Sequence, residues 1–467
     1  MVHIIRKELK ELTRDGRIKI TAIISIILLV IAAITEVSNY QKESHQHEES
    51  VSKERAIWES QEAKNPHAAA HYGTYIFKPK FALSLVDGGV TNYTGNSIFV
   101  EAHNKNEASF SSATDQTSLA RFGSLSINFV LLYLFPLISI LIGYNSYTKE
   151  REHQTYWLLK SQGVHPTKLV IGKWLATFLP ILVLTTTVFL VIGSILANIS
   201  DLEMFKWVSL WTLWGLYLLY YLIITTLTIL ISMWSKSSGV SLVSCLLIWI
   251  LFSFITPKFA TNIANVKNPY PSKSEFNTRI SNDKKQGLDG HNPWNEAAKK
   301  LESETLKNYG VESIDKLPFN YVGYRMQKGE EHEAKVYQKH YAALKTIATK
   351  QNDTYKQLSF ISPFIALRFL SMDLANSSDN LHWKFSEAVE RYRIQKQRFL
   401  NYDIKDNSKF GERGYKMTPE KFKNLPKFSF NPPTLIELLK NNTQNLFFLM
   451  LWLVLPFLGL LMTSKKI

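Results

Sequence analysis

Six long stretches without a charged side chain constrain the fold more than any other feature of this 467-residue sequence. Each one is long enough, or nearly so, for a helix across the hydrocarbon core of a bilayer, which is ~30 Å thick. They lie between Lys19 and Glu36, Arg121 and Lys149, Lys173 and Asp201, Lys206 and Lys236, Lys236 and Lys258, and Lys440 and Lys465. We therefore predict a mainly α-helical membrane protein with six transmembrane helices.

A soluble protein with buried helices and a cleaved signal peptide both fit these stretches less well. The mean hydropathy of -0.08 resembles that of a soluble protein, but it averages apolar runs with strongly polar ones. Buried helices of soluble proteins are usually interrupted by polar residues within about 10–14 positions. A signal peptide would concern only the first stretch. A long segment with Glu8, Glu11 and Asp15 precedes it and no clear cleavage site follows, so we predict an uncleaved anchor.

The distribution of Lys and Arg predicts the orientation in the membrane. Short cytoplasmic loops carry an excess of these residues. Basic residues gather before the first span, between the second and third, between the fourth and fifth, and after the sixth: Arg6, Lys7, Lys10, Arg14, Arg17, Lys19, Lys149, Arg151, Lys160, Lys168, Lys173, Lys236, Lys465 and Lys466. We predict both termini in the cytoplasm. The net charge of +15 fits contact with anionic lipids, and no nucleic-acid-binding motif accompanies it, so no nucleic-acid partner is expected.

These assignments divide the chain into alternating membrane and solvent segments. In order they are a cytoplasmic amphipathic helix (1–17), span one (18–38), an external segment (39–120), span two (121–147), a cytoplasmic segment (148–168), span three (169–197), a short external loop (198–206), span four (207–233), a cytoplasmic turn (234–237), span five (238–257), a second external segment (258–443), span six (444–463) and a cytoplasmic tail (464–467).

The two external segments are predicted to form one large, mostly helical domain. Helices are expected at 40–64, continuing span one, at 330–358, starting after Gly329, and at 381–399. Alternation between turn residues predicts a β-hairpin over 81–100. Segment 402–433 is predicted to be a loop whose final prolines, Pro432 and Pro433, start the last helix. Residues 362–374 fit either a helix lying on the outer membrane surface or a buried helix of the domain.

The segment TKEREHQTYWLLKSQGVHPTKLVIGKW, residues 148–174, joins spans two and three. Glu150, Arg151 and Glu152 open a helix whose first turn favours acidic residues, an apolar cluster follows, and Gly163 ends it. A soluble partner can bind a short helix of this kind and move it as a rigid body, so that the motion reaches spans two and three. The charge pattern alone favours an ordinary solvated loop helix instead.

These features together resemble the ABC-2-type permeases, the membrane subunits of ABC exporters. The family pattern E-R-E-x-G-T-x-x-x-L-L, followed later by G-K, is matched by Glu150-Arg151-Glu152, Thr155, Leu158-Leu159 and Gly172-Lys173, whereas Gln154 stands where the family often has glycine. The resemblance implies an elbow helix at residues 3–17 and a separate ABC ATPase subunit that binds a coupling segment. The residues expected at that interface are Glu150, Arg151, Glu152, Thr155, Trp157, Leu158, Leu159 and Gly163.

Short motifs outside the spans look like an uncharacterised bacterial branch of this family with a large external domain. They are Asn65-Pro66-His67, His71-Tyr72-Gly73, Asp87-Gly88-Gly89-Val90, Glu101-Ala102-His103, Ser362-Pro363, Leu370-Ser371 and Leu374-Ala375. The resemblance implies the inner membrane of a bacterium and a homodimer or a heterodimer with a paralogous permease.

The chain is not expected to be an enzyme or to need a cofactor. It has no G-x-x-x-x-G-K-[ST] loop to hold ATP phosphates, so energy must come from the ATPase partner. The alternative function is a membrane-anchored scaffold or mechanotransmitter whose external domain engages an envelope partner without transport. An external enzyme fits least, because no convincing nucleophile–base pair is present.

Two sets of residues carry weaker signals. His67 and His71 are four residues apart and share a helix face, and Glu101 and His103 lie in the same external segment, after His45 and His47. Such side chains ligate zinc or copper, but the set is incomplete and packing on a helix started by Asn65-Pro66 accounts for it, so no metal is predicted. Span threonines at 185–187, 225, 226 and 228 either line a pathway or bond backbone carbonyls and neighbouring helices.

Overall fold

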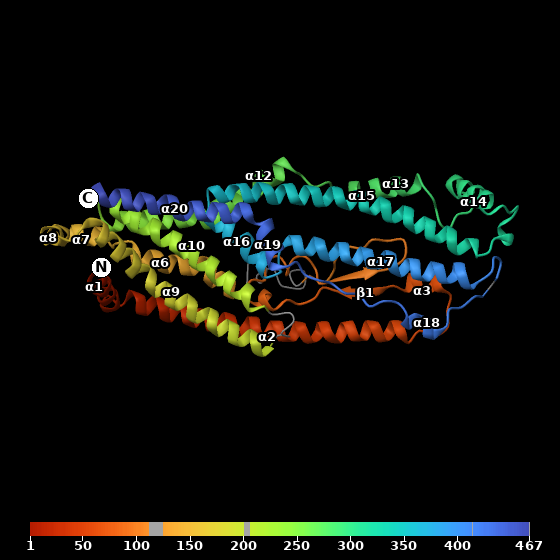
Figure 1. Cartoon of the computed structure of the whole chain (residues 1–467), viewed down its shortest axis with the longest axis horizontal. Helices are drawn as coiled ribbons and strands as arrows, with labels where there is room; N and C mark the ends of the chain where they lie inside the picture. Colours follow the sequence, from red (N-terminus) through yellow and green to blue (C-terminus); the bar gives the residue numbers. More distant parts are fainter. Residues whose placement is uncertain (112–124, 200–205, 413, 467) are drawn as a thin grey trace.

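The computed structural model describes residues 1–111, 125–199, 206–412 and 414–466. The molecule is elongated and mostly helical, and both termini lie at the same end of its long axis (Figure 1). Six apolar helices form the half near this end. Residues 40–111 and 268–431 form a long bundle that reaches the other end, which we call the distal domain.

Six helices are long and apolar enough to cross a membrane, which confirms the predicted fold class. They are α2 (Arg17–Glu59), the continuous α5–η3–α6 (Ile127–Phe129, Val130–Leu134, Phe135–Gly143), α9 (Pro166–Ile199), α10 (Trp207–Trp234), the continuous α11–η4–α12 (Ser238–Ile250, Leu251–Ile255, Thr256–Lys267) and α20 (Thr443–Lys466). Most of the predicted loop at 198–206, the end of the external segment 39–120 and the start of the predicted second span lie outside the described residues.

Two of these helices contain a π-helical turn just before a proline. The turn η3 precedes Pro136, and η4 precedes Pro257. Proline has no N–H and removes one bond of the regular α-helical ladder. A wider π turn is one way for a helix to absorb such an irregularity and continue. Pro180 and Pro456 lie inside α9 and α20.

Helix α10 is the centre of the membrane bundle and packs against α6, α9, α11 and α20. In its most apolar 18-residue window 72% of the residues are buried, compared with 17% in α2 and in α20. Apolar surface of that extent is unfavourable in water. The outer faces of α2 and α20 therefore suit contact with lipid.

Four of the six span threonines, Thr186, Thr187, Thr226 and Thr228, bond their own backbone, as the second alternative predicted, whereas the buried hydroxyls of Thr185 and Thr225 have no hydrogen-bond partner among the described residues. Thr186 donates to the carbonyl of Leu182 at 2.7 Å, and Thr228 donates to that of Ile224 at 2.8 Å. The indole of Trp214 also donates to Thr186 Oγ1 at 3.2 Å. These hydroxyls satisfy backbone groups and join neighbouring helices.

The distal domain is built from long antiparallel helices. Helices α15 (Tyr321–Gln357) and α17 (Asp379–Asn407) pack side by side along it, and the outer part of α2 forms a further side (Figure 1). The predicted helix that continues the first apolar stretch is confirmed as far as Glu59, where α2 ends, five residues before the predicted end at residue 64. The shorter elements are α3 (Pro66–Tyr72), β1 (Thr74–Phe77), η1 (Ala82–Leu85), β2 (Ser97–Val100), α13 (Lys273–Lys285), α14 (Glu296–Tyr309), η5 (Ile314–Lys316), η6 (Leu358–Phe360), α16 (Pro363–Leu374), α18 (Pro419–Lys423) and α19 (Leu435–Asn441).

Several predicted boundaries in this domain were wrong. The predicted hairpin over 81–100 contains only its second strand, β2, which pairs antiparallel with β1, Thr74 opposite Val100. Residues 82–85 form a buried 3₁₀ turn. Helix α15 begins at Tyr321 because Asn320 caps it, so Gly329 lies inside the helix. Helices α17 and α18 occupy part of the predicted loop 402–433, and the chain after the prolines enters α19 at Leu435, capped by Thr434.

Helix α16 is the buried alternative for residues 362–374. Ten of its twelve residues are buried, and it packs against α10, α20 and η4. Ser362 donates to the carbonyl of Phe252 at 2.9 Å. The distal chain therefore inserts one apolar helix among the membrane helices at the junction of the two halves.

Candidate functional site

The segment between α6 and α9 forms two short helices, α7 (Thr148–Glu152) and α8 (Thr155–Ser161). They lie at the end of the molecule that also carries α1 (Val2–Arg14) (Figure 1). Helix α1 is amphipathic and packs against α9 and α2. The N-terminal helix and the segment 148–163 thus meet at one end of the bundle.

Glu150 is the centre of an ion network that joins α1, α7 and α9. Its Oε1 accepts from Lys7 Nζ at 2.7 Å and from Lys173 Nζ at 3.0 Å, and its Oε2 accepts from Thr155 Oγ1 at 2.6 Å. Lys173 is 2% exposed and also donates to Glu8 Oε1 at 2.7 Å. Removing one partner of a buried ion pair generally costs about 3–5 kcal/mol, so these contacts fix α1 and α7 on α9.

A glycine allows α1 to approach α9 closely. A Cβ on Gly172 would lie 2.7 Å from the Cγ2 atom of Ile4, a distance that requires the helices to move apart. The two residues therefore act separately: Gly172 leaves space for α1, and Lys173 binds the carboxylate of Glu8, which belongs to α1.

Arg151 and Glu152 tie the same segment to the connection between α10 and α11. Arg151 donates to the carbonyl of Met233 at 2.6 Å. The two Glu152 oxygens accept from the N–H and the hydroxyl of Ser238, each at 2.7 Å. These bonds satisfy backbone groups at one helix end and at the start of another. Helix α7 is therefore bonded to three membrane helices and to α1.

The turn between α7 and α8 is left-handed at Gln154, where φ is 57°. A residue with a Cβ is disfavoured in this region and glycine is not. The structure explains why glycine suits this position and shows that glutamine adopts the same turn.

Two family models match the chain. Residues 57–271 match the model for ABC-2 family transporter protein, and residues 273–431 match a domain of unknown function, DUF3526. The chain therefore contains an ABC-2 transporter region followed by a domain of unknown function. The first match covers the helices from α3 to α12 with the segment 148–163, and the second covers most of the distal domain from α13 to α18. No curated protein matches the chain significantly.

The chain carries an exposed apolar surface on α8. Trp157 is 64% exposed and Leu158 is 59% exposed, whereas Tyr156 is buried and Leu159 packs against the buried cluster beneath. Gly163, with φ of 76°, follows the helix. Of the eight residues predicted at the partner interface, Glu150, Arg151 and Glu152 bond within the molecule. Trp157 and Leu158 are exposed.

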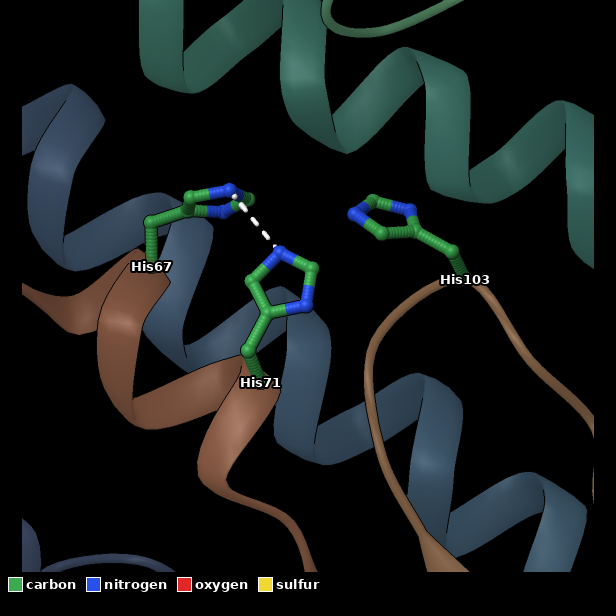
Figure 2. A group of neighbouring side chains, drawn as sticks. All are labelled: His67, His71 and His103. Atoms are coloured by element: carbon green, nitrogen blue, oxygen red, sulfur yellow. Dashed lines mark hydrogen bonds between the residues drawn. The ribbon is translucent and has the colours of Figure 1, made fainter.

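Three of the four predicted metal candidates come together in the distal domain. His67 and His71 lie one turn apart on α3, and His103, on the loop after β2, faces them (Figure 2). One ring nitrogen from each lies within 4.8 Å of the others. Glu101 is not part of this group, because its carboxylate accepts from Asn104 and Asn106 at 3.1 Å each.

Burial and neighbouring charges separate the pKa values of these histidines. Burial, and then the other imidazoles, lower the pKa of His67 to about 4. Burial also acts to lower the pKa of His103, but the hydrogen bonds to Glu330 and Glu333 outweigh it and raise the pKa to about 9.

Sequence reasoning missed the other members of both groups. His291 lies against His103 with a separation of 2.8 Å between their Nε2 atoms, although 188 residues separate them along the chain. Glu8 and Lys7 were seen only as part of a basic N-terminal helix. The sequence offers no signal that His291 joins the histidines. For Glu8 and Lys7 it offers one, because the N-terminal helix and the segment 148–173 each carry charges of both signs.

Proposed function

We propose that this chain is the membrane-spanning permease subunit of an ABC exporter, which moves a substrate across the bacterial inner membrane with ATP hydrolysed by a separate subunit. The ABC-2 family match supports the permease. In this proposal two such subunits, identical or paralogous, bracket the pathway, and the N- and C-terminal end of the bundle faces the cytoplasm.

The observation that carries the proposal is the exposed pair Trp157 and Leu158 on α8. Exposed tryptophan is a common anchor of protein interfaces. The helix beneath it is fixed to α9 through Glu150 and Lys173 and to the α10–α11 connection through Glu152. A subunit that binds α8 would therefore push several membrane helices at once.

A direct test replaces the exposed pair in the full-length chain. Membranes of the native host are solubilised, the chain is purified, and a bound ABC ATPase is identified by its sequence and its ATP hydrolysis. In the double variant Trp157→Asp/Leu158→Asp we expect the affinity for that ATPase to fall roughly 30-fold or more, because anchor residues of an interface contribute about 2 kcal/mol or more.

The matched control is Trp294→Asp, in the distal domain, where the side chain is 78% exposed. This variant should bind the ATPase as the unmodified chain does. Equal binding by the α8 variant, or a chain that never co-purifies with an ABC ATPase, would contradict the proposal.

A mechanotransmitter that engages an envelope partner is the second candidate. It is favoured by α2, which passes without a break from the membrane region into the distal domain, and by α12, which continues the fifth apolar helix and packs against α15. In proteoliposomes, ATP hydrolysis stimulated by a transported substrate supports the exporter. Stimulation only by a partner of the distal domain supports the mechanotransmitter.

A further inference from the structure

We propose that His67, His71, His103 and His291 bind one divalent transition-metal ion, Zn²⁺ by preference, which clasps two distant segments of the distal domain. This proposal does not depend on the proposed transport function.

The imidazole nitrogens converge at ligand-to-ligand distances. The Nε2 atoms of His67 and His71 are 3.1 Å apart, and those of His103 and His291 are 2.8 Å apart. The ring centres of His67 and His291 are 4.8 Å apart, and those of His71 and His103 are 5.2 Å apart. Two nitrogens bound at 2.0–2.1 Å to one tetrahedral zinc are separated by roughly 3.3 Å. His67, His71 and His103 each place a ring nitrogen within 4.8 Å of the others, and His291 adjoins this group through His103, so binding of one ion requires the rings to draw together.

A carboxylate orients one of the rings from behind, as in many metal sites. His103 Nδ1 lies 2.7 Å from Glu330 Oε1 and 3.3 Å from Glu333 Oε2, while its Nε2 faces the other histidines. Metal-bound histidines usually donate their second ring N–H to such a partner, which fixes the ring and makes it a better ligand. Glu330 is itself held by Arg393 NH1 at 3.1 Å.

The backbone around His103 is fixed by bonds from three sides. Its φ is 63°, a conformation that residues with a Cβ rarely adopt. Its N–H donates to Glu330 Oε1 at 3.1 Å, and its carbonyl accepts from Lys284 Nζ and from the Tyr337 hydroxyl, each at 3.0 Å. Strained backbone of this kind persists where the surroundings over-determine it, often at ligand sites.

The other three histidines are also positioned by specific local features. Asn65 caps α3, accepting from the N–H of His67 at 2.8 Å, and the helical spacing places His71 on the same face. Gly290 packs directly on Gly329 of α15, where a Cβ on Gly329 would lie 2.6 Å from Gly290 Cα. This close approach carries the neighbouring His291 to the cluster.

The donor set selects the metal. Four imidazoles, with His103 giving up its proton when the metal binds, suit Zn²⁺, Cu²⁺ or Ni²⁺, whereas Mg²⁺ and Ca²⁺ prefer oxygen ligands. The only cysteine of the chain, Cys245, is in α11 among the membrane helices. Of these metals, Zn²⁺ is the one whose structural sites are four-coordinate, and we therefore expect Zn²⁺.

A metal ion at this site would join two segments of the chain that match different family models. His67, His71 and His103 lie in the segment that matches the ABC-2 model, and His291 lies in the segment that matches the domain of unknown function. Three of the short motifs that resemble a branch of the family, at 65–67, 71–73 and 101–103, also surround the cluster. The ion would clasp the connection between α13 and α14 onto α3.

The experiment uses the full-length chain, purified in detergent without a polyhistidine tag and treated with a chelator. It is loaded with ZnCl₂, and bound zinc is measured by mass spectrometry of the metal; loading with Co²⁺ reports the ligand geometry by its absorption. We expect one zinc per chain and a tetrahedral cobalt spectrum. In His103→Asn/His291→Asn, stoichiometric binding should be lost.

Two further variants separate a ligand effect from a folding effect. Glu330→Gln removes a positioning carboxylate and should weaken zinc binding 10–100-fold without removing it. His45→Asn changes an exposed histidine of α2 outside the cluster and should bind zinc as the unmodified chain does. Gel filtration confirms that each variant is folded. Absence of stoichiometric zinc in the unmodified chain, or unchanged binding in the double variant, would overturn the proposal.

Discussion

At the scale of single residues, Lys396 shows how burial makes stability depend on pH. Its side chain is fully buried; Nζ donates to Thr74 Oγ1 at 3.0 Å and lies 4.1 Å from the centre of the Trp58 ring. Burial lowers its pKa to about 7, although the Glu54 carboxylate opposes this. The unfolded chain therefore holds this proton between pH 7 and about 10.5, and the folded chain does not.

We predict that stability rises with pH across that window because of this lysine. The penalty for a buried charge is complete below pH 7, and by pH 9 its removal contributes on the order of 3 kcal/mol. Thermal unfolding in detergent, followed by tryptophan fluorescence from pH 6 to pH 9, should show a midpoint that rises less steeply in Lys396→Met. The exposed Lys299→Met is the control, with an unchanged slope. Parallel slopes in all three proteins would refute the prediction.

The histidines mark how far residue-level prediction from the sequence can reach. The helix start at Asn65-Pro66 and the shared face of His67 and His71 follow from local rules, and the structure confirms both. His291 joins the cluster only through the tertiary contact between Gly290 and Gly329. Since no spacing along the chain encodes that contact, sequence reasoning found an incomplete set and included Glu101, which bonds elsewhere.

At the scale of helices and strands, Gly329 is a packing position inside α15. Alanine normally stabilises a helix interior by about 1 kcal/mol relative to glycine. Here the new Cβ would meet backbone atoms of Gly290 at 2.6 Å, and overpacking of this kind costs typically 1–3 kcal/mol. Gly329→Ala should therefore lower the free energy of unfolding and, if the metal proposal holds, weaken zinc binding at least 10-fold.

The control for this prediction is Gly215→Ala in α10, where a Cβ meets no atom within 4 Å. Thermal midpoints of both variants, measured in one detergent, should move in opposite directions or by clearly different amounts. A Gly329→Ala protein as stable as the control would contradict the packing argument. Because stability and zinc binding are measured separately, failure of the zinc proposal leaves the first result interpretable.

The elements best predicted from the sequence are those that one physical rule decides. The length of the uncharged stretches predicted the six membrane helices, because charged side chains are costly in hydrocarbon. The β-hairpin predicted over 81–100 was wrong in its first half, because the apolar residues at 82–85 form a buried 3₁₀ turn instead of a strand. The start of α15 was misplaced because Gly329 was interpreted as a boundary, although Asn320 is the residue that caps the helix.

At the scale of the whole molecule, a buried polar junction joins the distal domain to the membrane helices. Asp87 accepts from Ser371 of α16, from Asn128 Nδ2 at 2.9 Å and from the N–H of Gly89 at 3.0 Å. The hydroxyl of Tyr217, in α10, donates to Asn128 Oδ1 at 2.9 Å. Through these bonds the loop at 87–90 is attached to α10 and α16.

The same loop is pressed against the end of α16. Gly89 has a φ of 50°, and a Cβ there would lie 2.4 Å from the carbonyl oxygen of Ser377, which accepts from the N–H of Val90 at 2.9 Å. This explains the motif Asp87-Gly88-Gly89-Val90: the aspartate supplies the acceptors and the glycine allows the close approach. Any movement of α10 would reach the distal domain through this contact.

We predict that Asp87→Asn weakens the junction without removing bulk. Oδ1 of Asp87 accepts from Asn128 and from the Gly89 N–H, and Oδ2 accepts from Ser371. The amide keeps one acceptor, so either Ser371 or the pair Asn128 and Gly89 loses its acceptor, and an unsatisfied buried polar group costs about 1–3 kcal/mol. Burial raises the pKa of Asp87. If this carboxyl were protonated in the folded chain, the asparagine amide would replace it at little cost. The variant therefore also tests whether the folded chain needs the charged carboxylate at neutral pH. The thermal midpoint should fall, and limited proteolysis should cut the loop at 87–90 faster.

The control is Asp406→Asn, at an ion pair with Lys405 on the surface, which should change stability by no more than about 0.5 kcal/mol. If the two variants behave alike, the junction does not depend on the Asp87 carboxylate, and the close packing of Gly89 on Ser377 is left as the contact that attaches the loop.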